Sequence, residues 1–194
     1  MMNKMLKLAI LGVAACGVFA LTGCGGDKAA SSTAASSAAG QGALLQKIKK
    51  DGKLVVGTAP GFPPYEFLDT SVKDKKSITG IDIKIAEAVA KKLGVKLEVQ
   101  DMTFQSLLAS ITTGKIDIAI SAITPTAERE KTVDFSDSYL VGKHTLLVRK
   151  EDAGKYKTLA DFNGKKIAVQ KSSLQEKLTN EQIKDAQVVA LTKV

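Results

Sequence analysis

Two loops of this chain carry residue types that could hold a small charged ligand. The first, at 58–67, combines Phe62, Tyr65 and Glu66 with Gly and Pro, and the second, at 121–129, ends in Arg129. Arg is rare in this chain, because all but two of its 28 basic residues are Lys. A guanidinium can bind a carboxylate through two parallel hydrogen bonds. Arg129 is therefore a candidate carboxylate ligand, although from the residues alone a surface ion pair explains it equally well.

The composition argues against several other kinds of chemistry. Two Cys and one His are too few for a Cys-rich or His-based metal site, so we expect no metal and no cofactor. The Lys residues are spread along the chain without the Arg forks and stacking rings that bind nucleic acid, so we expect no nucleic acid partner. We interpret the net charge of +8 as a solvated surface near an anionic membrane. His144 and the pair Asp134 and Asp137 could suggest acid/base chemistry, but we interpret them as surface or hinge-side residues.

The spacing of apolar residues predicts the elements that position both loops. It predicts a strand at 54–56, a helix at 81–93, a strand at 96–99, a helix from 103 to a stop at Gly114, and a strand at 116–120. The first helix would bury Ile81, Ile85, Val89 and Leu93, and the second Leu107, Leu108 and Ile111. This order is typical of an α/β fold with a wound, mostly parallel sheet. Ligands bind beyond the carboxyl ends of such strands, where both loops lie.

A second set of elements is predicted after Tyr139. It comprises strands at 145–148, 166–170 and 187–191, with a helix that opens at Ser172 and Ser173. The folded part of the chain is long enough for one good core.

The first residues are predicted to be a secretory signal. An uncharged apolar run at 8–21 follows two Lys, and the segment ends in Leu-Thr-Gly-Cys at 21–24, which resembles the lipobox of bacterial lipoproteins. We therefore predict a signal peptide at 1–23, a lipidated Cys24 and a flexible Ala/Ser tether at 24–42. The folded part would begin near Ala43.

The folded part contains five short motifs whose order and spacing are informative. They are Phe62-Pro63-Pro64-Tyr65-Glu66-Phe67, Thr79-Gly80-Ile81-Asp82-Ile83, Gly114-Lys115-Ile116-Asp117-Ile118-Ala119, Thr124-Pro125-Thr126-Ala127-Glu128-Arg129 and Val133-Asp134-Phe135-Ser136. In order and spacing this set resembles the polar amino acid substrate-binding proteins of ABC transporters, the extracellular solute-binding proteins of family 3. The resemblance runs from about Leu54 to Leu178. The lipobox and tether fit it, because these receptors are often membrane-anchored lipoproteins.

The resemblance implies a periplasmic-binding-protein-like clamp, with lobe 1 at 43–138 and a partial lobe 2 at 139–194. Carried over by position, the ligand-binding residues are Phe62, Phe104, Ser121, Ala122, Thr124, Arg129 and Ser173. Arg129 would hold the α-carboxylate, and Thr124 with the backbone of Ser121 and Ala122 would meet the ammonium. Phe62 and Phe104 would flank the side chain. Ser173 would give a second-lobe carboxylate contact at a helix start, a position that plain N-capping also explains.

The function implied is that of a monomeric extracytoplasmic receptor, lipid-anchored to the cell membrane, that binds a polar amino acid. It would deliver this ligand to ABC transporter permease subunits by lobe closure, without acting as an enzyme and with no catalytic residue. A periplasmic dehydratase of the cyclohexadienyl type on the same fold is one alternative. It would need a carboxylate in the cleft, whereas we expect Glu66 to face outward beside Tyr65. A sensor without a transport role is the other alternative.

Two departures from the family pattern bear on the ligand. Ala59 stands where members that bind cationic or amide side chains often place an Asp, which predicts a neutral ligand in preference to arginine or lysine. The chain also stops at Val194, whereas family chains continue for several more elements. We therefore expect an incomplete second lobe, a truncated or fragmentary product, and little or no ligand binding by the 194 residues alone.

Overall fold

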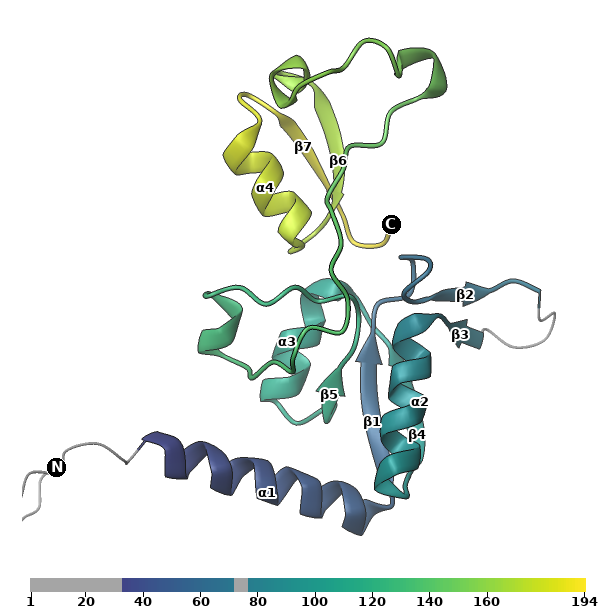
Figure 1. Ribbon diagram of the computed structural model, residues 1–194, viewed down its shortest axis with the longest axis vertical. Coiled ribbons are helices and arrows are strands. Elements are labelled where there is room, and N and C mark those ends of the chain that lie inside the picture. Colours follow the sequence, from purple (N-terminus) through teal and green to yellow (C-terminus); the bar gives the residue numbers. More distant parts are fainter. Residues whose placement is uncertain (1–32, 72–76) are drawn as a thin grey trace, which may run out of the picture.

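The computed structural model describes residues 33–71 and 77–194, with side chains described at 42–71 and 77–194 (Figure 1). In chain order the helices and strands are α1 (Thr33–Asp51), β1 (Lys53–Thr58), β2 (Phe67–Asp69), β3 (Ser77–Thr79), α2 (Ile81–Leu93), β4 (Lys96–Asp101), α3 (Phe104–Thr112), β5 (Ile118–Ala119), β6 (Lys166–Gln170), α4 (Leu174–Gln182) and β7 (Gln187–Leu191). Short 3-10 helices lie at Arg129–Lys131, Lys150–Asp152 and Leu159–Phe162. The predicted signal peptide and Cys24 lie outside the described residues. Among the described helices, none has both the length and the apolar character needed to cross a membrane.

The central sheet has the predicted parallel order. β1 lies between β4 and β5, and both neighbours run parallel to it (Figure 1). Val56 of β1 pairs with Val99 on one side and with Ile118 on the other. β5 is shorter than the strand predicted at 116–120, although the N–H of Asp117 still donates to the Val55 carbonyl at 2.9 Å. The β-α-β-α-β prediction is confirmed.

β1 is buried because helices cover both faces of the sheet. Leu54 and Val56 pack against α1 and α2 in one cluster, whereas Val55 packs with Leu107 of α3 in another. Successive side chains of a strand point to opposite faces, so each face of β1 contributes to a separate layer of core. This packing fixes the carboxyl end of β1, where the first ligand loop begins.

The buried face of α2 differs from the predicted one. Ile83, Ala86 and Ala90 are buried together with Asp82, whereas Ile81 is 39% exposed. The other predicted core residues of this helix, Ile85, Val89 and Leu93, are half-buried. Small Ala side chains let a helix approach the sheet closely, and a pattern that weighs only large apolar residues misses this. The face predicted for α3 is confirmed, with Leu107 buried and Leu108 and Ile111 half-buried.

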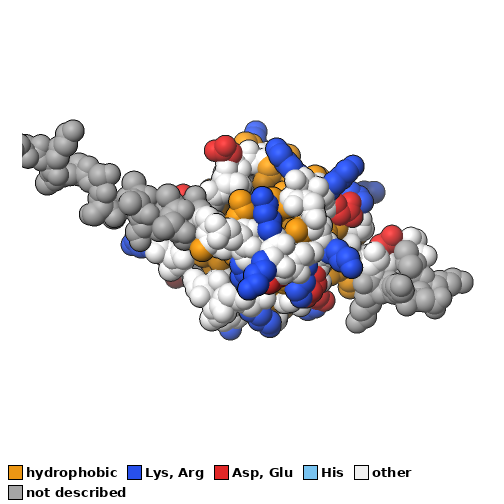
Figure 2. Space-filling model, turned by 90° about the horizontal axis from the view of Figure 1, so that it is seen from below, with side chains coloured by type: hydrophobic (Ala, Val, Ile, Leu, Met, Phe, Trp, Pro, Cys, Tyr) orange, Lys and Arg blue, Asp and Glu red, His pale blue; other side chains and the backbone are white. Residues whose placement is uncertain are grey.

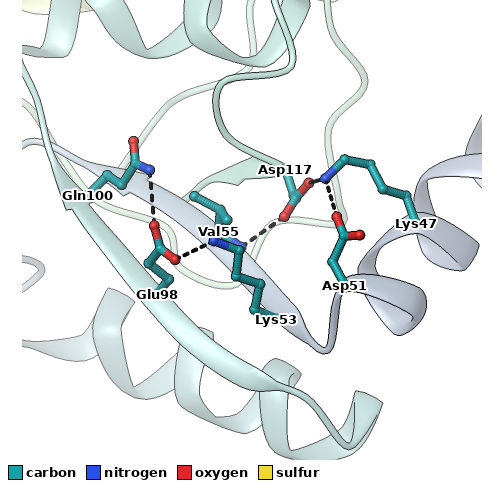
Figure 3. A network of polar contacts seen from close by, with 7 residues as sticks. All are labelled: Lys47, Asp51, Lys53, Val55, Glu98, Gln100 and Asp117. Carbon is teal, nitrogen blue, oxygen red and sulfur yellow. Dashed lines mark hydrogen bonds and ion pairs between the residues drawn. The ribbon is translucent and has the colours of Figure 1, made fainter.

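Regular structure begins earlier than the start predicted near Ala43. Helix α1 begins at Thr33, within the segment predicted to be a flexible tether. Ala has the highest helix propensity, so a composition without bulky residues is compatible with a helix. The end of α1 is tied to the sheet, since Lys47 Nζ lies 3.0 Å from Asp51 Oδ2 and 3.2 Å from Asp117 Oδ1 (Figure 3).

β6, α4 and β7 form a second body, distinct from the first body that contains β1, β4 and β5 (Figure 1). β6 and β7 run parallel with α4 between them in the chain, as predicted. The strand predicted at 145–148 is wrong, because the structure assigns no strand there. Leu146 packs against the cluster of Ile167 and Val169, while Leu147 is 99% exposed. The alternation of a strand is therefore present, but no described strand pairs with it.

Charged side chains are dispersed on the surface. Figure 2, seen from below, shows Lys and Arg side chains interspersed with acidic and hydrophobic ones rather than gathered in one patch. Exposed ion pairs join Lys53 to Glu98 at 2.7 Å and Lys84 to Glu87 at 2.9 Å.

Candidate functional site

The two loops predicted to hold the ligand meet at the carboxyl ends of β1 and β5. The N–H of Ala59, directly after β1, donates to Ser121 Oγ at 3.0 Å. Ser121 is 2% exposed, and the next residue, Ala122, has a φ of +46°. Few residues other than Gly adopt this left-handed conformation, so the turn at Ala122 is held by its surroundings. The two loops are thus joined through Ser121.

A tight turn in the first loop displays one aromatic ring. The N–H groups of Gly61 and Phe62 both donate to the carbonyl oxygen of Glu66, at 3.0 and 2.8 Å. Phe62 stacks on Tyr65 with ring centroids 5.1 Å apart, and it is 41% exposed. The chain then enters the antiparallel pair of β2 and β3, which the sequence analysis did not predict. Phe62 is therefore the accessible ring of this loop.

The expectation that Glu66 faces outward is wrong. Its side chain is 2% exposed, and its Oε1 accepts a hydrogen bond from Ser121 Oγ at 2.9 Å. Burial, with a further contribution from the nearby Asp82 carboxylate, raises the pKa of Glu66 to about 9. The carboxyl turns inward because Ser121, which is distant in the sequence, supplies a hydrogen-bond donor. So little of its surface is exposed that Glu66 offers no contact area to a ligand.

Arg129 lies where the two bodies approach each other. Its backbone N–H donates to Thr126 Oγ1 at 3.3 Å, and it begins a 3-10 helix. Its guanidinium donates from Nη1 to the Thr124 carbonyl at 2.7 Å and from Nη2 to the Ser172 carbonyl at 3.0 Å. These bonds use two of the five N–H donors of a guanidinium. Burial lowers the pKa of Arg129, and an anionic partner would offset this cost of burying its charge.

Phe104 lies under this guanidinium. The Arg129 Cζ atom is 5.5 Å from the Phe104 ring centroid, which is within the range of a cation–π contact. Both residues, with Ile123 and Ser172, help to line a hollow of about 40 Å³. The structure thus brings Phe104, Arg129 and the second body together, whereas Phe62 stacks on Tyr65 in a separate group.

Ser173 is the N-cap of α4. Its Oγ accepts a hydrogen bond from the N–H of Glu176 at 3.1 Å, and the residue is 5% exposed. The capping explanation is therefore observed for this side chain. The contact from the second body to Arg129 comes instead from Ser172, a residue that the sequence analysis did not assign to the site. Ser172 has a φ of +64°, in a conformation that a sequence pattern does not reveal.

Two more polar residues join the second loop and were also missed. Asp82, at the start of α2, is fully buried, and its Oδ2 accepts a hydrogen bond from the N–H of Ala122 at 2.7 Å. The Tyr139 hydroxyl donates to Asp82 Oδ1 at 3.0 Å. The one available signal was an Asp placed between two Ile residues, a polar side chain in an apolar surrounding.

A larger hollow lies away from these residues. It is an open depression of about 600 Å³ between the start of α2 and the β2–β3 pair. Its walls are mainly apolar and include Phe67, Ile81 and Ile85. It contains none of the predicted site residues, and it does not offer the set of convergent polar groups that an amino acid requires.

Comparison with known protein families assigns the chain to a class. Residues 54–187 match the family model of the bacterial extracellular solute-binding proteins, family 3. This match covers more than half of the chain and includes both loops, Arg129 and α4. The chain therefore belongs to family 3 of the bacterial extracellular solute-binding proteins, and its fold is periplasmic-binding-protein-like.

Similar curated proteins are binding proteins for amino acids. The arginine-binding extracellular protein ArtP of Bacillus subtilis (strain 168) is 40% identical over 172 residues, which are 89% of this chain and 58% of ArtP. The L-cystine-binding protein TcyA of the same organism is 32% identical over 175 residues, 90% of this chain and 62% of TcyA. The chain thus spans about three fifths of the length of these relatives.

Similar solved structures are also of amino-acid-binding proteins. An amino acid ABC transporter substrate-binding protein from Streptococcus pneumoniae Canada MDR_19A, bound to L-arginine, has a TM-score of 0.75 and 42% identity over 78% of this chain and 62% of that one. The ancestral amino acid-binding protein AncCDT-1, a precursor of cyclohexadienyl dehydratase, has a TM-score of 0.72 and 38% identity over 77% of this chain and 65% of that one.

Proposed function

We propose that the protein is an extracytoplasmic receptor that binds a polar amino acid between its two bodies and delivers it to an ABC permease. The observation that carries this proposal is the position of Arg129, whose guanidinium contacts the Thr124 carbonyl of the first body and the Ser172 carbonyl of the second. A ligand that replaces these contacts would touch both bodies. It would therefore bind the closed arrangement better than an open one, which is the condition for ligand-driven closure.

In this proposal each part of the ligand has its own partners. Arg129 pairs with the α-carboxylate, while the Thr124 side chain and the carbonyls of Ser121 and Ala122 receive the ammonium. The exposed Phe62 ring and the Phe104 ring flank the side chain. Ser173 contributes through the start of α4, where backbone N–H groups and the helix dipole favour an anion.

Arginine is the first ligand to test. Relatives at 40% and 42% identity carry arginine in their names or structures, and an exposed Phe62 ring can hold a cationic side chain over its face. The absence of a carboxylate at Ala59 predicts a neutral ligand instead. This argument is weakened by the packing of Ala59, which is 6% exposed in the cluster of Val55, Leu107 and Ile116.

The dehydratase alternative draws on the similarity to AncCDT-1 and on the presence of a buried acid near the loops. An acid/base residue must come within hydrogen-bond reach of its substrate. Glu66 is 2% exposed and bonded to Ser121, which favours a role inside the protein. Binding without covalent chemistry is therefore the function that the site supports best.

A thermal-shift panel of the twenty amino acids tests this function, with prephenate turnover measured in parallel. Two proteins are compared, the 194-residue chain and a chimaera that continues from Val194 with the corresponding C-terminal segment of ArtP. At a ligand concentration of 100 Kd we expect the chimaera to gain roughly 5–10 °C in Tm, and the shorter chain to gain little. Turnover of prephenate, or no shift in the chimaera with any amino acid, would overturn the proposal.

A further inference from the structure

Four residues from separate segments of the chain meet around two buried carboxyl groups beside the ligand loops. Glu66 ends the first loop, Asp82 opens α2, Ser121 begins the second loop, and Tyr139 lies where the chain passes to the second body. Glu66 and Asp82 are 2% and 0% exposed. The function proposed above uses neither carboxyl group.

Gly80 explains why Asp82 lies so close to the first loop. The N–H groups of Ile81 and Asp82 donate to the carbonyls of Pro64 and Tyr65, each at 3.0 Å. A Cβ atom at Gly80 would clash with the carbonyl oxygens of these two loop residues, and its φ of +128° suits Gly alone. The Thr-Gly-Ile-Asp-Ile motif therefore presses the start of α2 against the loop that carries Glu66.

The two buried carboxyl groups are held by consecutive residues, because Ser121 Oγ donates to Glu66 Oε1 and the Ala122 N–H donates to Asp82 Oδ2. Ionised carboxylates are acceptors only, so two neighbouring carboxyl groups can bond to each other only through a proton. Glu66 Oε2 is buried and has no donor among the described residues, whereas Asp82 receives two donors, the Ala122 N–H at 2.7 Å and the Tyr139 hydroxyl at 3.0 Å. Donors favour the ionised form of the carboxyl they reach, which assigns the charge to Asp82 and the proton to Glu66.

We propose that Glu66 is a neutral carboxylic acid that donates its proton to Asp82, and that this pair is the positioning element of the ligand loops. Through Ser121 Oγ, Glu66 fixes the N–H of Ala59 in the first loop. Through Oδ2, Asp82 holds Ala122 in its left-handed conformation. The link to the ligand rests on the proposed function, which gives the Ser121 and Ala122 carbonyls to the ammonium, but the shared proton does not depend on it.

In the described part of the chain, the groups around the pair are acidic or neutral. The titratable groups that face Glu66 are Asp82 from α2 and Tyr139 from the segment between the bodies, and the second loop contributes the neutral Ser121. Among the described residues no Lys, Arg or His forms an ion pair with either carboxyl. One negative charge and one proton are therefore shared by the pair as a unit.

Two isosteric substitutions in the full 194-residue chain test where the proton lies. In Glu66→Gln the amide can donate to Asp82 and its oxygen can accept from Ser121, so we expect a Tm within about 2 °C of wild type. In Asp82→Asn an amide NH₂ replaces an oxygen that receives a donor, so we expect Tm to fall by roughly 3 °C or more. Glu87→Gln on the exposed face of α2 is the control for the substitution itself. Equal losses in the two variants, or a larger loss in Glu66→Gln, would overturn the assignment.

The pH profile gives a readout that a merely structural role would not change. The pKa of Glu66 is raised in the folded protein, to about 9, above its value of 4.5 in an unfolded chain. The folded state therefore holds more protons than the unfolded state between these values, and wild-type stability falls as pH rises through this window. Glu66→Gln has no such group. We expect the Tm of wild type minus the Tm of Glu66→Gln to decrease steadily from pH 5 to pH 8.5. A difference that stays constant over this range would contradict the proposal.

Isotope-edited infrared spectra at pH 7 complete the test. A protonated carboxylic acid gives a carbonyl band that is separate from the bands of carboxylates, and we expect this band in wild type and in Glu87→Gln but not in Glu66→Gln. Absence of the band in wild type would overturn the shared proton whatever the ligand is. If the band is present but no amino acid binds the ArtP chimaera, the proposed function fails while the acid pair stands.

Discussion

At the scale of single residues, Arg129 is the group on which the proposed site depends most. The guanidinium lies over Phe104 and reaches carbonyls on both bodies, at 2.7 and 3.0 Å. Its planar fork can exchange these neutral acceptors for the two oxygens of a carboxylate without moving far. Arg129 is thereby suited to bind a carboxylate, and this binding would change its contact with Ser172 of the second body.

Replacement of Arg129 tests this role in the ArtP chimaera. Removal of one partner of a buried charge pair costs about 2–5 kcal/mol, so Arg129→Ala should weaken amino acid binding by roughly thirty-fold to several thousand-fold. Arg129→Lys should also lose most of the affinity, because an ammonium cannot form two parallel bonds with a carboxylate. Calorimetry on folded protein measures both effects. Arg149→Ala, which removes the other Arg of the chain from an exposed position, is the matched control. Near-wild-type affinity in Arg129→Ala would remove this residue from the site.

The sequence could predict Arg129 but not the environment of Glu66. Arg129 was recognisable because it is rare and follows a strand, and Ser173 because it precedes a helical pattern. Whether a carboxyl turns inward depends on partners such as Ser121, which is 55 residues away in the chain. Local sequence carries no signal of such partners. Burial of an acid is therefore a property of the assembled fold.

At the scale of elements, Asp117 joins three of them. Its Oδ2 accepts a hydrogen bond from the N–H of Val55 in β1 at 2.8 Å, and its Oδ1 receives Lys47 of α1 (Figure 3). Asp117 itself directly precedes β5. The short β5 thus gains a side-chain bond to β1 in addition to its ladder, which helps to explain how a two-residue strand holds its place beside β1.

Asp117→Ala should destabilise the first body. The substitution leaves the N–H of Val55 buried without its side-chain acceptor and frees Lys47, so we expect a loss of about 1–3 kcal/mol in the free energy of unfolding. For a chain of this size that corresponds to a Tm lower by roughly 2–10 °C. Glu98→Ala breaks an exposed ion pair with Lys53 on the same sheet and should cost less than about 1 kcal/mol. Equal Tm values for the two variants would show that Asp117 does not stabilise this junction.

Elements with their own core were predictable, and elements that need a partner were not. The order of β1, α2, β4 and α3 follows from apolar spacing and from the glycines that end the helices, such as Gly94 with its φ of +71°. The segment at 145–148 has the alternation of a strand, yet a strand forms only where another strand accepts its hydrogen bonds. The position of the buried face on α2 depended on small Ala residues, whose close packing is visible only in three dimensions.

At the scale of the whole molecule, the described residues form two bodies that meet at Arg129, with α1 at the far end of the first body (Figure 1). The Leu-Thr-Gly-Cys sequence at 21–24, which resembles a lipobox, supports the further proposal that the protein is anchored to the outer face of the cell membrane. Anchoring would keep the site near its permease.

Cys24→Ala tests the anchor. Without a lipid-bearing Cys the chain would have no acyl chain to hold it in a bilayer. We therefore expect the variant to move from the membrane fraction to the soluble fraction when cells are fractionated. Cys16→Ala, which changes a residue of the predicted signal peptide, should leave the distribution unchanged. Sedimentation of Cys24→Ala with membranes would contradict the lipoprotein prediction.

The attachment of α1 has a mechanical consequence. Tension applied through its N-terminal end enters the first body at the start of β1 and near the contact between Lys47 and Asp117. β1 would then be loaded in shear along six residue pairs with β4. The ligand loops begin at the opposite end of this strand, about 20 Å away. Force applied at this end of α1 is thus spread over a parallel ladder before it can strain the two loops.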